Sequence, residues 1–321
     1  MRTIALEEHF LTADLAHYSD PTRSLAQPQI WKEAERRLAD LAELRLADMD
    51  AAGVDVAVLS LTAPGIQAEP DPQLAVERAR EVNDFVAGVV AANPARFRGF
   101  AALPLQNPDA AAKELERAVE QLGLCGALVN AHTLGVYLDA PPLRVVWEAA
   151  ERLDVPLYLH PAIGFDTPHV IAGHPELIGP MWSWGTDTAT HALRMVFAGV
   201  FDDFPGAKLL LGHMGESLPY SLWRLDSRWD WHRHHGIELD LGHPSEYLRR
   251  NLYVTTSGVC DAAPLLCALS AFGSDHVLFA TDYPYEDIAT ATAFLAGAPI
   301  SEDDRAKLSH LNAERLLHID R

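Results

Sequence analysis

The sequence contains few cysteines, and none of them has a spacing typical of a zinc or redox site. Its 321 residues include only Cys125, Cys260 and Cys267, with no CxxC pair. Three thiols cannot all pair within one chain, and thiols of reducing compartments stay reduced. We therefore expect buried, reduced thiols in a cytoplasmic protein.

The sequence also lacks an excess of basic residues and any long apolar run. Asp and Glu number 45 against 25 Lys and Arg, which gives a formal charge of −20. Nucleic acids and anionic membrane surfaces favour basic faces, so we expect neither as a partner. No apolar run approaches the roughly 20 residues that a membrane-spanning helix needs. The alternating pattern that begins at Thr3 is not that of a secretion signal.

Eight short apolar or β-branched runs alternate with longer amphipathic stretches. We predict strands at 3–8, 55–60, 98–103, 126–130, 156–160, 207–212, 252–256 and 276–281. The helical stretches are 32–52, 71–92, 108–121, 142–152, 187–203 and 286–297. Continuous apolar strands alternating with helices indicate a buried parallel sheet of the α/β class.

A closed (β/α)8 TIM barrel explains this alternation better than an open doubly wound sheet. No GxGxxG or Walker-type loop follows any predicted strand, so nucleotide binding loses support. No linker divides the chain, and we predict one barrel domain over residues 1–321. The long segments 11–30 and 161–186 follow strands at the ends where barrels keep their active sites. We interpret the aromatic and His-rich stretch 229–235 as a surface helix or subunit contact.

The first strand ends in the ionisable run Glu7-Glu8-His9. Side chains two residues apart on a strand share a face. We therefore expect Glu7 and His9 to point into the mouth of the barrel and Glu8 to point away from it.

Three later strands end in the same manner, with His160, His213 and Asp282. The carboxyl ends of barrel strands lie together, where barrel chemistry takes place. Carboxylates and imidazoles that converge there suit a divalent ion such as Zn²⁺ or Mn²⁺. A single strand-end His or Asp is often only a capping residue. Such residues at four strands indicate a metal site.

Glu216 follows His213 by three residues, at the start of the next helix. This spacing allows Glu216 to accept a hydrogen bond from the imidazole or to line the same pocket. Alternatively, Glu216 only complements the positive end of the helix. We favour the paired role.

Six segments together resemble the amidohydrolase superfamily, and more narrowly its non-oxidative aromatic acid decarboxylases of the γ-resorcylate (2,6-dihydroxybenzoate) type. They are ALEEHF (5–10), LSLTAPGIQ (59–67), YLHP (158–161), LGHMGESLPYSLWRLDSR (211–228), NLYVTTSG (251–258) and FATDYPYE (279–286). Hydrolases of the superfamily typically begin with HxH, whereas this chain has ExH at Glu7. That departure fits the decarboxylases.

The resemblance implies a carboxy-lyase with one divalent ion, Zn²⁺ or Mn²⁺, and no redox cofactor. It assigns the metal to Glu7, His9, His160 and Asp282, and a catalytic role to His213 and Glu216. The expected reaction is the reversible decarboxylation of an ortho-hydroxybenzoate, such as 2,6-dihydroxybenzoate, to a phenol and CO₂. Protonating the ring carbon first avoids an aryl anion, and we expect Asp282 to be that acid. The family is typically oligomeric, so a homodimer or homotetramer is expected.

An aromatic acid substrate needs an apolar pocket. Phe10, Trp182, Tyr283 and Pro284 occupy loops or strand ends where they could sandwich the ring, or they are ordinary core residues. Arg224 matches a segment that the resemblance places near the substrate and a subunit contact.

Two other functions stay open at this point. A metal-dependent hydrolase of the same superfamily would open a lactone or an amide, with Asp282 as the base for a water molecule. A non-catalytic scaffold would have lost its chemistry, but every ionisable position at the mouth is intact. A decarboxylase acting on a different acid is a close variant of the main hypothesis.

Overall fold

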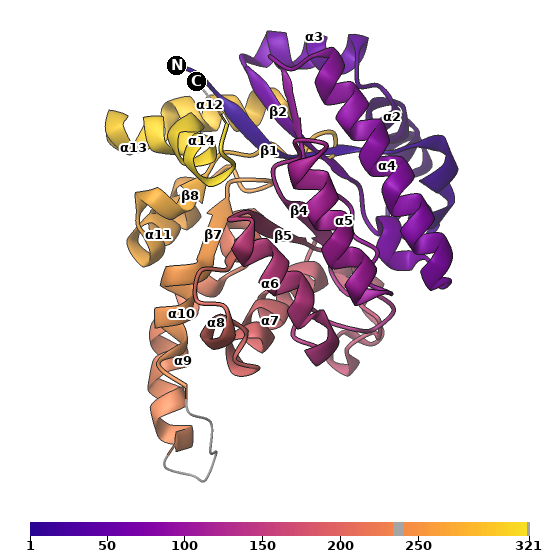
Figure 1. Cartoon of the computed structure of the whole chain (residues 1–321). Helices are drawn as coiled ribbons and strands as arrows, with labels where there is room; N and C mark the ends of the chain where they lie inside the picture. Colours follow the sequence, from indigo (N-terminus) through magenta and orange to yellow (C-terminus); the bar gives the residue numbers. More distant parts are fainter. Residues whose placement is uncertain (234–240, 320–321) are drawn as a thin grey trace.

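The computed structural model describes residues 1–233 and 241–319, and eight parallel strands form their centre (Figure 1). The strands are β1 (Ile4–Phe10), β2 (Val56–Leu61), β3 (Phe97–Gly99), β4 (Ala127–Asn130), β5 (Pro156–His160), β6 (Lys208–Leu211), β7 (Leu252–Thr255) and β8 (Val277–Leu278). They pair in sequence order within two sheets, β1–β3 and β4–β8. Isolated parallel bridges, Leu6 with Ala280 and Ala101 with Ala127, join the sheets at both edges. The ring is therefore closed, and the predicted (β/α)8 barrel is confirmed.

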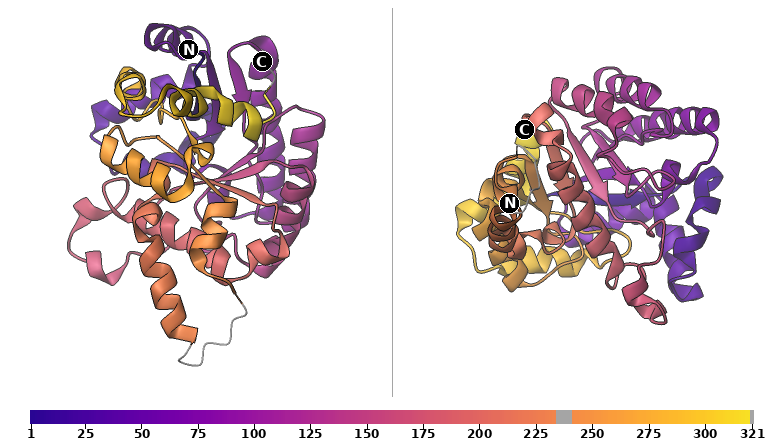
Figure 2. Two further views of the ribbon diagram at one scale, coloured as in Figure 1. Left: turned by 90° about the vertical axis from the view of Figure 1, so that its left-hand side faces the viewer. Right: turned by 90° about the horizontal axis from the view of Figure 1, so that it is seen from below.

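Helices surround the strands on the outside, as the views in Figure 2 show. They are α1 (Asp20–Arg23), α2 (Pro28–Ala39), α3 (Glu43–Ala52), α4 (Pro72–Ala92), α5 (Pro108–Glu120), α6 (Arg144–Arg152), α7 (Ser183–Phe197), α8 (Val200–Asp203), α9 (Leu218–Arg233), α10 (Pro244–Asn251), α11 (Ala262–Phe272), α12 (Ile288–Gly297), α13 (Glu302–Ala306) and α14 (Asn312–Leu316). Asp71 begins α4 by accepting hydrogen bonds from the backbone of Gln73 and Leu74. None of the described helices is long and apolar enough to cross a membrane.

Two predicted helices are each divided in the structure. The stretch 32–52 forms α2 and α3, because the backbone turns extended at Asp40, whose carboxylate accepts hydrogen bonds from the amides of Ala42 and Leu44 next to the start of α3. The stretch 187–203 forms α7 and α8, which meet at Gly199 with a φ of 72°. A left-handed glycine ends the regular hydrogen-bond pattern of α7.

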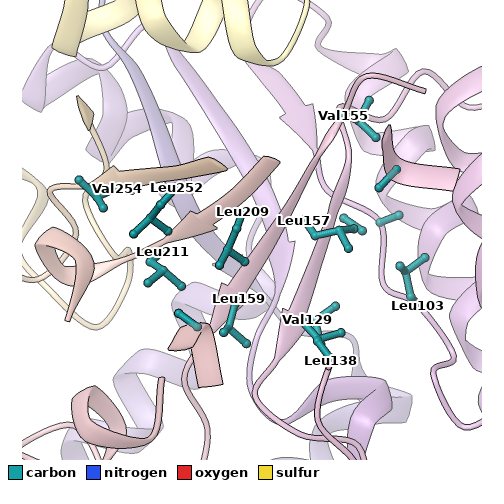
Figure 3. Packing of buried hydrophobic residues seen from close by; sticks show 14 of the residues in the cluster. Leu103, Val129, Leu138, Val155, Leu157, Leu159, Leu209, Leu211, Leu252 and Val254 are labelled. Atoms are coloured by element: carbon teal, nitrogen blue, oxygen red, sulfur yellow. The ribbon is translucent and has the colours of Figure 1, made fainter. Parts of the chain in front are cut away.

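The strands bury their two faces in different parts of the core. Leu157, Leu159, Leu209 and Leu211 point outward and pack beneath the helices (Figure 3). Alternate residues fill the barrel interior, among them Ile4, Leu6, Val58, Leu210 and Leu278, together with residues of α14. A barrel filled in this way holds the residues at its mouth on a rigid base.

Candidate metal centre

Four predicted ligands meet at the carboxyl ends of the strands. Glu7, His9, His160 and Asp282 each present one donor atom, and these atoms lie within 4.8 Å of one another. His160 Nε2 is 3.3 Å from Glu7 Oε1, and His9 Nε2 is 3.4 Å from Asp282 Oδ1. The cluster combines β1, β5 and the segment after β8, so it exists only when the barrel is closed.

An irregularity in β1 turns both of its donors inward. The pairing with β2 shifts between Ala5 and Glu8, and Glu7 adopts a φ of 62°. Leu6 points into the barrel, so regular alternation would turn Glu7 outward. The extra residue of the bulge lets Leu6 and Glu7 share the inner side, after which His9 also faces inward. The common orientation of Glu7 and His9 was predicted, but the bulge that produces it was not.

One oxygen of the Glu7 carboxylate is held by three hydroxyl groups. Tyr158 and Ser257 donate hydrogen bonds to Oε2, and Thr255 Oγ1 lies 3.4 Å from the same oxygen. Gly212 provides the space for this arrangement, because a Cβ there would come within 2.6 Å of Oε2. These contacts fix the carboxylate so that its other oxygen, Oε1, faces the cluster.

Two buried donor atoms fit a cation at the centre of the cluster. Within residues 1–233 and 241–319, Glu7 Oε1 and His9 Nε2 have no hydrogen-bond partner. Ser60 Oγ lies 3.2 Å from the other ring nitrogen of His9, Nδ1. A histidine that donates from Nδ1 presents the lone pair of Nε2, as metal ligation requires. The donor set of two carboxylates and two imidazoles suits Zn²⁺ or Mn²⁺.

The carboxylates of the cluster are held in their ionised form. Burial by itself would raise the pKa of Glu7, but His213 and His160 outweigh this effect and lower it. Burial would likewise raise the pKa of Asp282, whereas contacts with His213 and His9 hold it well below its usual range. A buried and a partly buried carboxylate in one cluster require a positive partner, and a divalent ion supplies one.

The predicted pairing of His213 with Glu216 is confirmed. Glu216 Oε1 lies 2.6 Å from His213 Nδ1. The other ring nitrogen, Nε2, is 3.5 Å from Glu7 Oε1 and 3.6 Å from Asp282 Oδ2. A Cβ at Gly185 would lie 2.8 Å from Glu216 Oε2, so α7 approaches the pair closely. The imidazole is thereby fixed beside the cluster, with one face toward the cavity.

Glu8 points away from the mouth, as predicted, and joins β1 to the end of β8. Its carboxylate accepts a hydrogen bond of 3.1 Å from the Thr281 amide and bonds of 2.7 and 2.9 Å from the Thr281 hydroxyl. The His9 amide donates to the Tyr283 carbonyl at 2.8 Å, and the buried Arg45 donates to the His9 carbonyl. Side-chain bonds therefore hold the two strands together where the ladder is irregular.

A cavity of about 1110 Å³ opens above the cluster. His160, His213 and Asp282 form part of its wall. Both of the long loops predicted at this end contribute to it, for example through Leu25 and Trp182. Ligand pockets of this kind combine apolar walls with a few polar groups, so the cavity suits an aromatic acid.

Two residues predicted to contact the substrate lie in the core instead. Phe10 is buried and packs against Phe85, with ring centroids 5.9 Å apart. It directly follows His9, so strand alternation turns it toward the helices. Tyr283 is also buried, with its hydroxyl donating to Asp48 at 2.8 Å. The prediction for these two residues is wrong, because each neighbours an inward-facing ligand and so faces away.

Pro284 and Arg224 are not among the described residues that line the cavity. Pro284 is half-buried, and Arg224 is exposed on α9. For Arg224, a contact with substrate stays a prediction. Trp182 does line the cavity, together with Tyr285 and Thr62, which sequence reasoning did not single out.

The hydroxyls around Glu7 were also missed, although the sequence contains a signal for them. Tyr158 precedes His160 by two residues on β5, so both share a face. Thr255 and Ser257 are likewise two residues apart at the end of β7. Polar residues at alternate positions near a strand end thus mark the lining of the barrel mouth.

Comparison with known proteins matches residues 9–319 to the amidohydrolase family. The chain belongs to this family. The gamma-resorcylate decarboxylase of Rhizobium sp. (strain MTP-10005) is 41% identical to this amidohydrolase over 329 residues, which cover 99% of this chain and 98% of the relative. The predicted resemblance is therefore confirmed.

Solved structures agree with this relationship. A 2,6-dihydroxybenzoate decarboxylase complexed with 2,6-dihydroxybenzoate is 41% identical to this amidohydrolase, with a TM-score of 0.91 and coverage of 99% of this chain and 100% of that one. A dihydroxybenzoic acid decarboxylase from Polaromonas sp. JS666, with bound manganese and the inhibitor 2-nitroresorcinol, is 42% identical, with a TM-score of 0.93 and coverage of 100% and 98%. These relatives are decarboxylases, so they do not support the lactone or amide hydrolase that the sequence left open.

Proposed function

We propose that this amidohydrolase catalyses the metal-dependent, non-oxidative decarboxylation of an ortho-hydroxybenzoate such as 2,6-dihydroxybenzoate. The products are a phenol and CO₂, and the reaction is reversible. One observation carries the proposal: the four-donor cluster opens into a cavity suited to an aromatic acid, in a chain similar over its length to decarboxylases of this kind. The enzyme is thus a carbon–carbon lyase.

Glu7, His9, His160 and Asp282 would hold the divalent ion, Mn²⁺ or Zn²⁺. When bound, the ion would act as a Lewis acid toward the substrate carboxylate and its ortho oxygen and would stabilise phenolate charge. The orphaned Glu7 Oε1 and His9 Nε2 support this assignment.

Asp282 would transfer the proton to the ring. Its Oδ1 faces His9 and its Oδ2 lies beside His213, and the residue borders the cavity. Asp282 is ionised at rest, so it takes a proton from the substrate hydroxyl and delivers it to the carbon that bears the carboxylate. The carbon–carbon electron pair then returns to the ring as CO₂ leaves. His213, oriented by Glu216, would hold the substrate oxygen or relay its proton.

The first test is to incubate metal-loaded protein with 2,6-dihydroxybenzoate and to measure resorcinol by chromatography. We expect formation of resorcinol that stops when a chelator removes the metal. Asp282→Asn should abolish turnover while substrate binding stays largely intact, because the amide cannot exchange the proton. Near-normal turnover by Asp282→Asn would overturn the assignment of the acid. If the loaded protein decarboxylated neither this acid nor salicylate or 2,3-dihydroxybenzoate, the proposed function would be wrong.

We also propose that residues 1–321 act as one domain in a cytoplasmic homo-oligomer, a dimer or a tetramer, without nucleic acid or membrane partners. The formal charge of −20 supports the absence of such partners. Helix α9 projects from the barrel (Figure 1), and its Tyr220 and Trp223 are 87% and 77% exposed. Exposed aromatic groups often mark an interface, so light scattering should report a mass above that of one chain.

A further inference from the structure

Two hydroxyl groups face each other on the cavity wall next to the metal cluster. Thr62 follows β2 and Tyr285 follows β8, and their hydroxyl oxygens are 2.6 Å apart. Both residues line the cavity that Asp282 also borders. The ring centroid of Tyr285 lies 5.6 Å from that of His9, so the pair stands close to a predicted metal ligand.

The backbone fixes both residues in place. The Thr62 amide donates to the Phe10 carbonyl at 3.0 Å, and the Tyr285 amide donates to the Asp282 carbonyl at 2.8 Å. The two hydroxyls are therefore carried by the same strand ends that carry the metal ligands. A side chain held in this way presents a preorganised contact to a bound ring.

The hydrogen-bond count of the pair leaves one donor unused. Each hydroxyl has one hydrogen, and the bond between Thr62 and Tyr285 consumes only one of the two. In the part of the chain that the structure describes, neither hydroxyl has another hydrogen-bond partner. The remaining O–H belongs to a pair that borders the cavity, where a ligand oxygen could accept it.

We infer that the Tyr285–Thr62 pair selects the substrate by donating a hydrogen bond to an oxygen substituent of the ring other than the chelating ortho-hydroxyl. The preferred substrates are then benzoates with at least two ring oxygens, and salicylate is disfavoured. This inference rests on the proposed function, because it takes the ring to be anchored at the metal by its carboxylate and one hydroxyl.

If the bond between the two hydroxyls served only to hold the cavity wall together, a different result would be expected. Its loss would affect all substrates equally, since the wall itself would be disturbed. A selective contact instead changes the ratio of the kcat/KM values for a substrate with the second hydroxyl and a substrate without it. Two substrates that share the chelating groups therefore separate the two roles.

The experiment compares 2,6-dihydroxybenzoate with 2-hydroxybenzoate in the metal-loaded enzyme. We expect Tyr285→Phe and Thr62→Val each to lower the ratio of the two kcat/KM values by about 3- to 10-fold, the effect of one neutral hydrogen bond. Thr62→Ser, which keeps the hydroxyl, should restore the ratio. Tyr220→Phe is the matched control, because Tyr220 also lines the cavity but is 87% exposed. An unchanged ratio in both Tyr285→Phe and Thr62→Val would overturn the inference.

A binding measurement tests the inference without turnover. Tryptophan fluorescence titrations would give dissociation constants for 2-nitroresorcinol and 2-nitrophenol, which differ by one ring hydroxyl. Tyr285→Phe should bring the ratio of the two dissociation constants closer to one by about 3- to 10-fold. If the wild-type enzyme turned over neither benzoate, the proposed function would fail, and an unchanged binding ratio would then overturn the inference separately.

Discussion

Replacing Thr281 by valine removes the hydroxyl that bonds Glu8, and we expect this change to weaken both metal binding and the fold. Thr281 is fully buried, and its hydroxyl lies 2.7 and 2.9 Å from the two oxygens of the Glu8 carboxylate. Valine has nearly the same shape, so no cavity forms. Glu8 keeps only the bond from the residue 281 amide, at 3.1 Å.

The expected losses of stability and metal affinity follow from the environment of the Thr281 hydroxyl. Burial raises the pKa of Glu8 to about 8, so this carboxyl group is largely neutral near pH 7. Leaving a buried polar group without its partner costs about 1–3 kcal/mol, so we expect the free energy of unfolding to fall by about 2 kcal/mol. Glu8 directly follows the proposed ligand Glu7, and Thr281 directly precedes the proposed ligand Asp282. Loosening this junction should weaken Mn²⁺ binding by about 10- to 100-fold, as is typical for groups that orient metal ligands.

The assay needs metal-free protein for stability and a separate titration for affinity. Urea denaturation of the metal-free enzyme gives the first quantity, and competition with a chelator of known affinity gives the second. Thr256→Val is the matched control, because its hydroxyl makes two hydrogen bonds of 3.1 Å to the backbone of Ala280 and none to Glu8. We expect the control to lose stability but to bind Mn²⁺ nearly normally. Wild-type affinity in Thr281→Val would refute the argument.

Three further changes have expected outcomes. Glu216→Gln keeps a partner for His213 but removes the charge that stabilises its protonated ring, so kcat should fall by about 100-fold with little change in KM. An unchanged kcat would rule out a catalytic role for the pair. Burial lowers the pKa of His191 to about 3 from its ordinary 6.5, so the fold should lose about 1.4 kcal/mol per pH unit below pH 6.5. Urea midpoints at pH 7 and 5 should show this loss in the wild type and a smaller one in His191→Gln. Burial also raises the pKa of Cys125 to about 11, whereas Cys260 is exposed, so the expectation of buried thiols is wrong for Cys260. A thiol reagent at pH 8 should label Cys260 first and Cys125 only after unfolding, as peptide mapping would reveal.

The strands could be predicted closely because each is a continuous apolar run. The fifth strand was predicted at 156–160 and is observed as Pro156–His160. The eighth was predicted at 276–281 but is observed only as Val277–Leu278. Beyond it, the amide of Phe279 donates to the Leu308 carbonyl, and that of Ala280 donates to the Thr256 hydroxyl. Apolar patterning reports burial and not the hydrogen-bond partner, so it could not show where the ladder ends.

The donor cluster could be predicted because metal-ligand chemistry and strand-end position are both visible in a sequence. The side chains that hold these donors in place could not be predicted, because they depend on contacts between distant segments. Tyr158 is 151 residues from Glu7, and Ser257 is 250 residues from it. The error at Phe10 has a different cause, since strand alternation from the inward-facing His9 already turns Phe10 toward the helices.

The hydroxyls around Glu7 also explain why this position suits a carboxylate and not the histidine of an HxH sequence. Tyr158 and Ser257 both donate to Oε2, with Thr255 3.4 Å away, while Oε1 stays directed at the cluster. A carboxylate has enough lone pairs to accept these bonds and still bind a cation, whereas an imidazole that binds a cation through one nitrogen has no acceptor left for them. The three hydroxyls also bond one another, Tyr158 to Thr255 and Thr255 to Ser257, so a histidine here would leave one buried O–H donor without an acceptor, at a cost of about 1–3 kcal/mol. The glutamate and its hydroxyl partners therefore form one matched set, and exchanging the ligand alone would not convert this site into that of a hydrolase.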